Sequence, residues 1–242
     1  MFKYSEIALK INGTGNLNIF SSKFFKKYNQ YEIYINDSIY YQDQNEYNFN
    51  YSENITLKVK WNITITKASN MFNNCNNIFE IDLPNFDTSQ VTDISYMFYN
   101  CSSFISLNLD SLNTSQVINM SYMFYNCSLL TSLNLDNFET LKVSNMSYMF
   151  YKCSSLNLLN LSNFDTNEVL NMACMFSYCS SLSSLDLSNF NTSHVNTIRG
   201  IFYDYSSLIL LNLSNFDTSH VNTMRGVFYG CLSLKSLDIS KF

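Results

Sequence analysis

The sequence has little of several residue types, and each shortage excludes a class of protein. It contains one proline and five glycines in 242 residues, so a flexible Pro/Gly-rich linker is absent. Charged residues make up 14% of the chain and the formal net charge is −5. We expect no nucleic-acid partner, because such proteins gather Lys and Arg on one face. The apolar content of 46%, with this modest charge, also argues against disorder.

Long hydrophobic runs are absent as well. No stretch of 18 apolar residues occurs, so we expect no transmembrane helix and no direct insertion into a membrane. Residues 1–6 lack the basic and apolar segments of a secretory signal. We therefore expect either a cytoplasmic protein or a leader that lies outside this sequence.

Motifs for catalysis and metal binding are missing too. Residues 1–66 contain no Gly-rich phosphate loop and no nucleophile motif. The seven cysteines include no C-x-x-C pair, the spacing that metal sites commonly use. We expect no enzyme activity, no catalytic residue, no metal site and no cofactor.

What the sequence does contain is a 26-residue repeat. A Met-Phe-x-x-Cys motif begins at Met71, returns four times at this spacing, and twice more in altered form up to Cys231. A constant period between 20 and 50 residues is typical of solenoids. Three apolar columns begin at Ile78, Ile81 and Leu83 and recur with the same step. The spacing of two between the second and third columns is that of a strand.

The second half of each unit has helical spacing. In the unit at Val117, apolar residues follow at i+3, i+6, i+7 and i+10, a stripe on one helical face. In six successive units, a residue suited to cap a helix stands at the same repeat position beside this stripe: Asp93, Asn119, Asn145, Asn171, Thr197 and Thr223. The sequence therefore predicts an α/β solenoid of seven units, each with one short strand and one or two helical turns. Seven strands would form a parallel ladder about 30 Å long.

Residues 1–66 lack the period and are predicted to form a β-rich module. Segments 6–11, 31–35 and 55–65 alternate between apolar and polar residues, as strands do. Because the ends of a solenoid need covering, we expect this module to cap the first unit. The predicted domains are a capping module at 1–66 and a solenoid at 67–242, whose last unit is truncated at Phe242.

The repeated string resembles a known family. Residues 185–193 read Leu-Asp-Leu-Ser-Asn-Phe-Asn-Thr-Ser, and residues 211–219 are nearly identical. With the Met-Phe-x-x-Cys motifs, this string resembles the BspA-like leucine-rich repeat surface proteins, a group also described through a mycoplasma lipoprotein-associated repeat domain. The resemblance covers residues 68–242. It implies a leucine-rich-repeat fold, a location on the cell surface or outside the cell, and a role in adhesion.

Two columns of side chains are candidates for partner binding. The first is polar and lies between the apolar strand positions, where side chains point away from the core: Asp82, Asn108, Asn134, Asn160, Asp186 and Asn212. The second is aromatic and lies beside the Met-Phe motif: Tyr99, Tyr125, Tyr151, Tyr203 and Tyr229. Tyrosine is enriched at interfaces. The alternatives are simple solvation of the polar column and a tyrosine sheath that only covers the core.

These columns favour a non-catalytic recognition or adhesion protein with a protein or glycan partner. The alternative is an intracellular leucine-rich-repeat scaffold for protein–protein interaction, which the missing leader favours. A further alternative is an ice-binding face, which would need exposed threonines in one column: Thr88, Thr114, Thr140, Thr166, Thr192 and Thr218.

Cysteine and histidine also recur at the repeat spacing. The cysteines that close the apolar stripe are predicted to be reduced and buried, because free Cys packs as a small hydrophobe: Cys75, Cys101, Cys127, Cys153, Cys179 and Cys231. Cys174 occupies a tyrosine column and is expected to be more exposed. His194 and His220 are predicted to be solvated copies of one position.

Overall fold

The fold is known from a computed structural model that describes residues 5–12, 15–28, 31–35, 38–40, 46–49, 55–61, 63–237, 239 and 242. Within these ranges the chain is mostly sheet and turn, with one short helix, α1 (Ser22–Phe25). The strands are β1 (Ser5–Ile11), β2 (Gly15–Asn18), β3 (Tyr31–Ile35), β4 (Ser38–Tyr40), β5 (Glu46–Phe49), β6 (Ile55–Trp61), β7 (Ile78–Asp82), β8 (Ser106–Asn108), β9 (Ser132–Leu133), β10 (Leu158–Leu159), β11 (Ser184–Asp186) and β12 (Leu210–Asn212).

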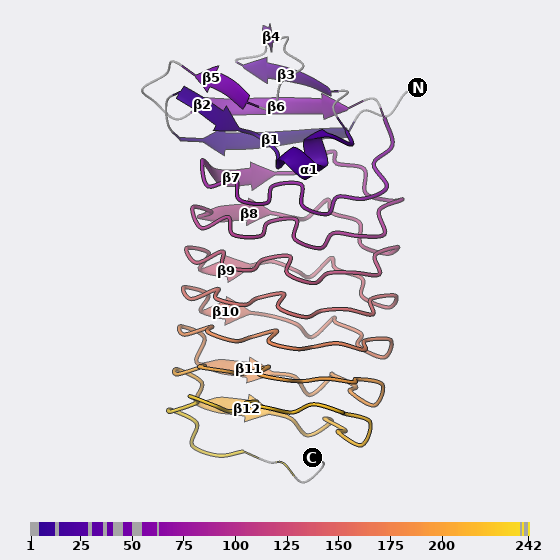
Figure 1. Ribbon diagram of the computed structural model, residues 1–242, viewed down its shortest axis with the longest axis vertical. Helices are drawn as coiled ribbons and strands as arrows, with labels where there is room; N and C mark the ends of the chain where they lie inside the picture. The colour runs from indigo at the N-terminus through magenta and orange to yellow at the C-terminus, as the bar shows by residue number, and fades with distance from the viewer. Residues whose placement is uncertain are drawn as a thin grey trace.

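The first strands form one sheet with the beginning of the repeated region (Figure 1). The strand order is β4-β3-β6-β1-β7-β8, and β1 is antiparallel to both β6 and β7. The strands predicted at 6–11, 31–35 and 55–65 are confirmed as β1, β3 and β6. β6 ends at Trp61, earlier than predicted. Residues 63–65 are not in a strand, and residue 62 lies outside the described residues. Since β1 pairs with β7, the edge of the first repeated strand is covered by hydrogen bonds.

The repeated region consists of layers stacked along the long axis of the molecule (Figure 1). Strands one repeat apart pair in parallel, as in β7 with β8, β9 with β10, and β11 with β12. A second line of parallel bridges joins residues 26 apart, from Asp93 to Thr223. The predicted parallel pairing of repeated strands is therefore confirmed for these pairs.

The predicted helical turns are wrong. The described part of the repeated region, 63–237, contains no helix. Tyr96 and Asn100 have φ values of 57° and 58°, whereas every residue of an α-helix has negative φ. The N–H groups of Ile94, Tyr96 and Phe98 donate to carbonyls of the following layer at 3.1, 3.0 and 2.9 Å, so they are not available for helical bonds.

A chain of tight turns explains why the sequence indicated a helix. Met97 N–H donates to the Ile94 carbonyl and Cys101 N–H to the Phe98 carbonyl, each three residues back. The positive φ at the third residue of each turn is the feature of a type II turn. Such turns return apolar side chains to the interior every three or four residues, which is also the spacing of a helical face. The predicted cap position has a related role, because Asp93 Oδ1 accepts from Ser95 N–H at 3.0 Å.

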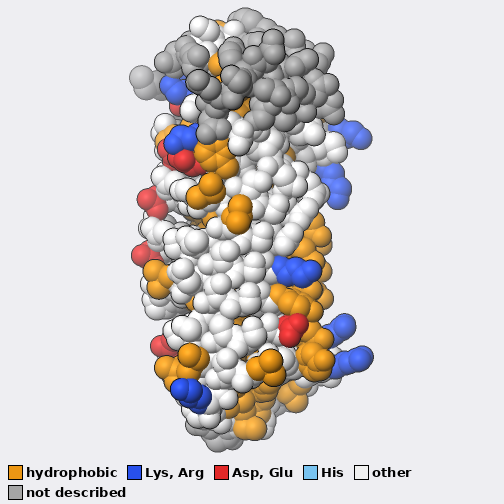
Figure 2. Space-filling view, turned by 90° about the vertical axis from the view of Figure 1, so that its left-hand side faces the viewer, with side chains coloured by type: hydrophobic (Ala, Val, Ile, Leu, Met, Phe, Trp, Pro, Cys, Tyr) orange, Lys and Arg blue, Asp and Glu red, His pale blue; other side chains and the backbone are white. Residues whose placement is uncertain are grey.

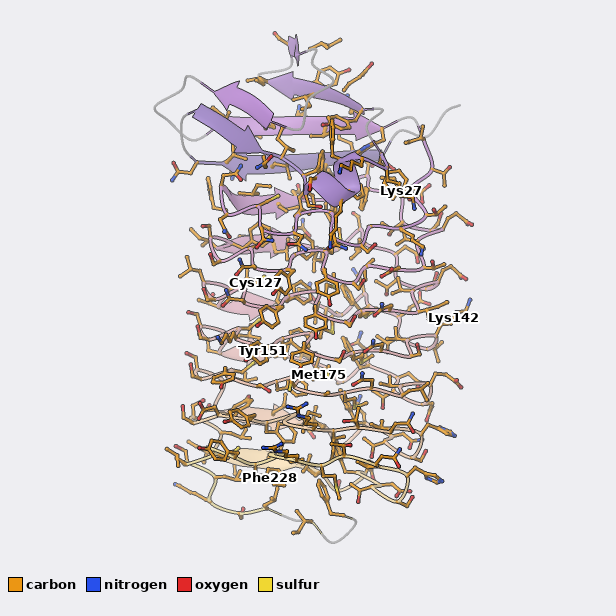
Figure 3. All side chains as sticks on the ribbon, in the orientation of Figure 1. Lys27, Cys127, Lys142, Tyr151, Met175 and Phe228 are labelled. Carbon is orange, nitrogen blue, oxygen red and sulfur yellow. The ribbon has the colours of Figure 1, made fainter. Side chains whose placement is uncertain are left out.

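The core runs through the layers without interruption. Met, Phe, Cys, Val and Leu of successive repeats are buried, and Figure 3 places Met175 within the stack and Lys142 at its edge. One phenylalanine column stacks with ring centroids 5.6 to 6.0 Å apart: Phe72, Phe98, Phe124, Phe150, Phe176, Phe202 and Phe228. Each layer thus buries its apolar side against its neighbours.

Candidate binding surface

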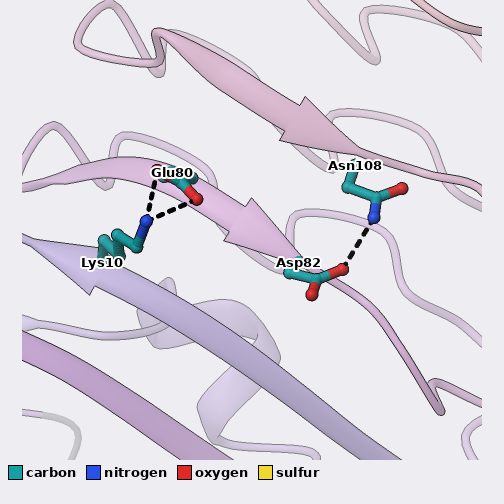
Figure 4. A network of polar contacts seen from close by, with 4 residues as sticks. All are labelled: Lys10, Glu80, Asp82 and Asn108. Atoms are coloured by element: carbon teal, nitrogen blue, oxygen red, sulfur yellow. Dashed lines mark hydrogen bonds and ion pairs between the residues drawn. The ribbon is translucent and has the colours of Figure 1, made fainter.

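The predicted polar column lies along the repeated strands. Asp82 is half-buried, and the other members are exposed: Asn108, Asn134, Asn160, Asp186 and Asn212. Neighbouring layers bond to each other here, since Asn108 Nδ2 donates to Asp82 Oδ1 at 2.9 Å (Figure 4). Beside them, Lys10 Nζ contacts the Glu80 carboxylate at 2.8 Å and ties β1 to β7.

Most of this column also holds the local backbone. Asn108 Oδ1 accepts from Asp110 N–H at 3.1 Å, and Asp186 Oδ1 accepts from Ser188 N–H at 2.9 Å. Asn134, Asn160 and Asn212 make the same bond. This geometry is an Asx turn, in which the side chain replaces a backbone acceptor. The polar column is therefore partly occupied by the fold, which leaves it less hydrogen-bonding capacity for a partner.

The predicted tyrosine column is joined by a second one, and together they cover one side of the layers. Tyr99, Tyr125 and Tyr151 stack with centroids 4.6 Å apart. The neighbouring column of Tyr96, Tyr122 and Tyr148 stacks at 4.5 and 4.6 Å. We call these six residues the tyrosine face. All six residues are half-buried, so each keeps part of its surface accessible.

The second column has an unusual backbone. Tyr96, Tyr122 and Tyr148 have φ of 57°, 59° and 58°, a left-handed conformation that side chains other than glycine adopt at a cost of about 1–2 kcal/mol. The ring contacts in the column are worth about 0.5–1.5 kcal/mol per pair. Stacking therefore offsets much of the cost, and the rings are fixed in position by the backbone that carries them.

The hydroxyl groups of Tyr122, Tyr148 and Tyr151 remain protonated near neutral pH. Burial raises the pKa of Tyr122 and of Tyr151 to about 12. For Tyr148 the hydrogen bond with the Cys174 thiol, followed by burial, raises the pKa. These phenols are therefore donors as well as acceptors toward a partner.

The predicted column is interrupted at Ser177, which is buried. Tyr178, the next residue, takes over and lies 5.3 Å from Tyr151 and 5.6 Å from Tyr203 between ring centroids. Tyr203 and Tyr229 then stack at 4.7 Å, and Tyr229 is the most exposed, at 62%. Tyr178 was missed by the sequence analysis. A tyrosine displaced by one position from a broken column is the signal that could have found it.

The cysteine prediction is confirmed for most of its column. Five of these cysteines are free and buried, and Cys231 and Cys174 are free and half-buried. Each buried thiol from Cys101 onward donates to a phenylalanine carbonyl of the preceding layer, as Cys127 does to Phe98 at 3.1 Å. Tyr205 replaces Cys at one position, and its buried hydroxyl has no hydrogen-bond partner among the described residues.

The threonine column excludes the ice-binding alternative. Thr88, Thr114, Thr140, Thr166 and Thr192 are at most 1% exposed, and Thr218 is 9% exposed. The hydroxyls of the first five donate to backbone carbonyls of the adjacent layer, so no flat threonine face exists on these layers. His194 and His220 are exposed, as predicted.

Other classes of site are not formed by the described residues. Across these residues, no three His, Cys, Asp or Glu side chains gather closely enough to hold a metal ion. Within the same ranges, no helix has the length and hydropathy needed to cross a bilayer.

The layered sheet, the 26-residue backbone ladder and the two aromatic columns define a repeat protein. The chain belongs to the family described as "Mycoplasma protein of unknown function, DUF285", whose model matches residues 38–134 and 128–242. No curated protein and no solved structure matches the chain. This match agrees with the resemblance to a mycoplasma repeat domain that the sequence indicated.

Proposed function

We propose that the protein is a non-catalytic recognition protein that binds a protein or glycan through the tyrosine face. The observation that supports this function is a regular array of six half-buried tyrosines in two stacked columns. Tyrosine supplies large contact area at low entropic cost, and these rings are already ordered before binding. The half-buried Tyr203 and the exposed Tyr229 extend the array.

We also propose the finer classification of the fold and family. Residues 67–242 then form a leucine-rich-repeat-like solenoid of seven 26-residue units, capped by residues 1–66, and the protein is a BspA-like surface protein with a role in adhesion. The bridges between residues 26 apart and the pairing of β1 with β7 support this proposal. A solenoid presents equivalent side chains at regular intervals, which suits an extended partner.

The location is tested by protease treatment of intact source cells, followed by detection of the native protein. The proposal predicts removal of the protein under conditions in which a known internal protein stays intact. Full protection, while a known surface protein is cleaved, would contradict adhesion. That outcome would favour the alternative of an intracellular scaffold that uses the same face.

A further inference from the structure

The tyrosine face ends in a hollow toward the C-terminal layers. Its volume is about 610 Å³, and tyrosine and arginine side chains form much of its wall: Tyr148, Tyr151, Tyr178, Tyr203, Arg199 and Arg225. Figure 2 shows hydrophobic side chains gathered along one edge of the lower half of the molecule, with Lys and Arg side chains projecting beside them.

The hollow exists because one tyrosine column stops. After Tyr148 the equivalent positions are Cys174, Gly200 and Gly226, with φ values of 55°, 59° and 71°. The backbone therefore keeps the same left-handed conformation, while the ring is lost. Gly226 lies directly against the Tyr203 ring. A Cβ atom added to this glycine would be only 3.2 Å from Cδ2 of Tyr203.

Two arginines appear in the same layers. The position before the tyrosine column is a buried serine in three earlier layers, namely Ser95, Ser121 and Ser147, and becomes exposed Arg199 and Arg225. Their carbonyls accept from the N–H groups of Cys174 and Gly200 at 2.8 and 2.9 Å, so the two are fixed in adjacent layers. Neither forms an ion pair with any side chain that the structure describes.

We propose that this hollow binds an acidic oligosaccharide, whose carboxylate or sulfate groups contact Arg199 and Arg225. This inference rests on the proposed function and names the ligand class for it. Arginine presents a planar fork of donors that matches such anions. Tyrosine ring faces pack against the apolar face of a sugar ring, and the neutral hydroxyls bond to its hydroxyl groups.

An acidic peptide is a poorer match to the same residues. Peptide grooves use apolar pockets for side chains or a free strand edge for the backbone. The lining contains no Leu, Ile, Val, Met or Phe. The N–H groups of Cys174, Tyr178 and Gly200 are already bonded to the next layer.

The test measures binding of the whole 242-residue chain to immobilised oligosaccharides of one length. The probes are a glucuronate-containing oligosaccharide, its carboxyl-reduced neutral form, and a sulfated form, with an acidic peptide tested beside them. We expect the chain to prefer an acidic probe to the neutral one, and added salt to weaken that binding. The carboxylate and sulfate arms separate the two sources of negative charge.

Variants locate the binding. Arg199→Gln with Arg225→Gln is expected to weaken acidic-probe binding at least about tenfold, because charge-assisted bonds are lost. Lys142→Gln is the matched control, as this exposed cation lies at another edge and bonds Gln116, and it should bind as the parent does. Gly200→Tyr continues the column of Tyr148 into the hollow and should also weaken binding.

Three results would overturn the proposal: equal binding of acidic and neutral probes, arginine variants that bind like Lys142→Gln, or binding of an acidic peptide and of no oligosaccharide. Each of them leaves recognition by the tyrosine face intact. Failure to bind any of these probes, and any of a set of immobilised matrix proteins, would instead reject the proposed function itself.

Discussion

At the scale of single residues, polar side chains join each layer to the backbone of the next. Thr166 Oγ1 donates to the Asn191 carbonyl at 2.9 Å and accepts from Asn191 N–H at 2.8 Å. Thr114 forms the same two bonds with the backbone of Glu139, and Thr140 forms them with the backbone of Asp165. One buried hydroxyl thus satisfies a donor and an acceptor of the neighbouring layer, which the layer spacing would otherwise leave unpaired.

Replacing Thr166 by Val tests this role. Valine has the same shape and no hydroxyl, so the N–H and C=O of Asn191 lose their partner. We expect the free energy of unfolding to fall by about 1–3 kcal/mol, measured by urea denaturation. Thr166→Ser keeps the hydroxyl and should cost less. Equal loss in both variants would show that packing of the methyl group, and not the hydrogen bonds, matters.

The cysteines differ in reactivity according to burial. Burial raises the pKa of the Cys75 and Cys153 thiols to about 12, and the thiolate is the reactive form. Alkylation of the native protein at neutral pH should therefore modify the half-buried Cys174 and Cys231 first. Mass spectrometry of peptides identifies the modified sites. Rapid modification of Cys127 or Cys153 without denaturant would contradict the buried column.

At the scale of elements, the repeated turns and the aromatic columns act together. Each layer holds residues of positive φ at fixed places, such as Tyr122 and Asn126, and the side chains they carry stack on those of the next layer. Phe150 is fully buried, with its ring 5.7 Å from Phe124 and from Phe176. An interior column is thus shared by neighbouring layers, so that damage to one position affects several.

Truncation of this column tests the shared core. Phe150→Ala should lower the free energy of unfolding by about 3–5 kcal/mol, with loss of structure in adjacent layers. Leu158→Ala is the control, because Leu158 is 66% exposed, and changes at such positions stay within about 0.5 kcal/mol. Calorimetry compares the two. A Phe150→Ala melt that coincides with that of the parent would refute the continuous core.

Local sequence patterns predict some of these elements and miss others. The strand at Ile81 follows from spacing alone, and both Ile81 and Leu83 are buried as predicted, although β7 ends at Asp82, one residue before Leu83. The helix prediction fails because buried turns and helices share a spacing of three to four residues. What distinguishes them is the left-handed backbone at Tyr96 and Asn100, and tyrosine gives no local signal for it. Gly200 and Gly226 do indicate a left-handed backbone, but only once the repeats are aligned, so that these glycines fall at the position of Tyr148.

The candidate surface was also predicted in part. The sequence places Tyr99, Tyr125 and Tyr151 in one column, and the structure stacks their rings. The role of Asn108 and its equivalents as turn acceptors depends on backbone geometry after the strand and could not be read from composition. The hollow beside Arg199 arises from the absence of a ring, which becomes visible only when the layers are superposed.

At the scale of the whole molecule, many buried acids are held in their neutral form. Tyr122, Tyr151, Cys75 and Cys153 have pKa values above those of the unfolded chain, because burial disfavours their charged forms. Unfolded thiols ionise near pH 8.5 and phenols near pH 10. Above these values the unfolded state binds fewer protons than the folded state, so stability falls as pH rises.

Alkaline titration tests this linkage. The urea midpoint should be unaffected by these groups at pH 7, begin to fall above about pH 8.5, and fall further above about pH 10. Phe substitution at Tyr122 and Tyr151 should remove part of the fall above pH 10. A midpoint that stays constant to about pH 11 would contradict the raised pKa values.

The most direct test of the account is partner binding by variants of the tyrosine face. The whole chain is applied to a panel of immobilised matrix proteins and oligosaccharides, beside Tyr125→Ser with Tyr151→Ser. A double variant of two exposed leucines, Leu158→Ser with Leu210→Ser, serves as the matched control. The account predicts that the tyrosine variant retains its fold and loses binding at least about tenfold, while the leucine variant binds normally. Unchanged binding by the folded tyrosine variant would show that the tyrosines only cover the core.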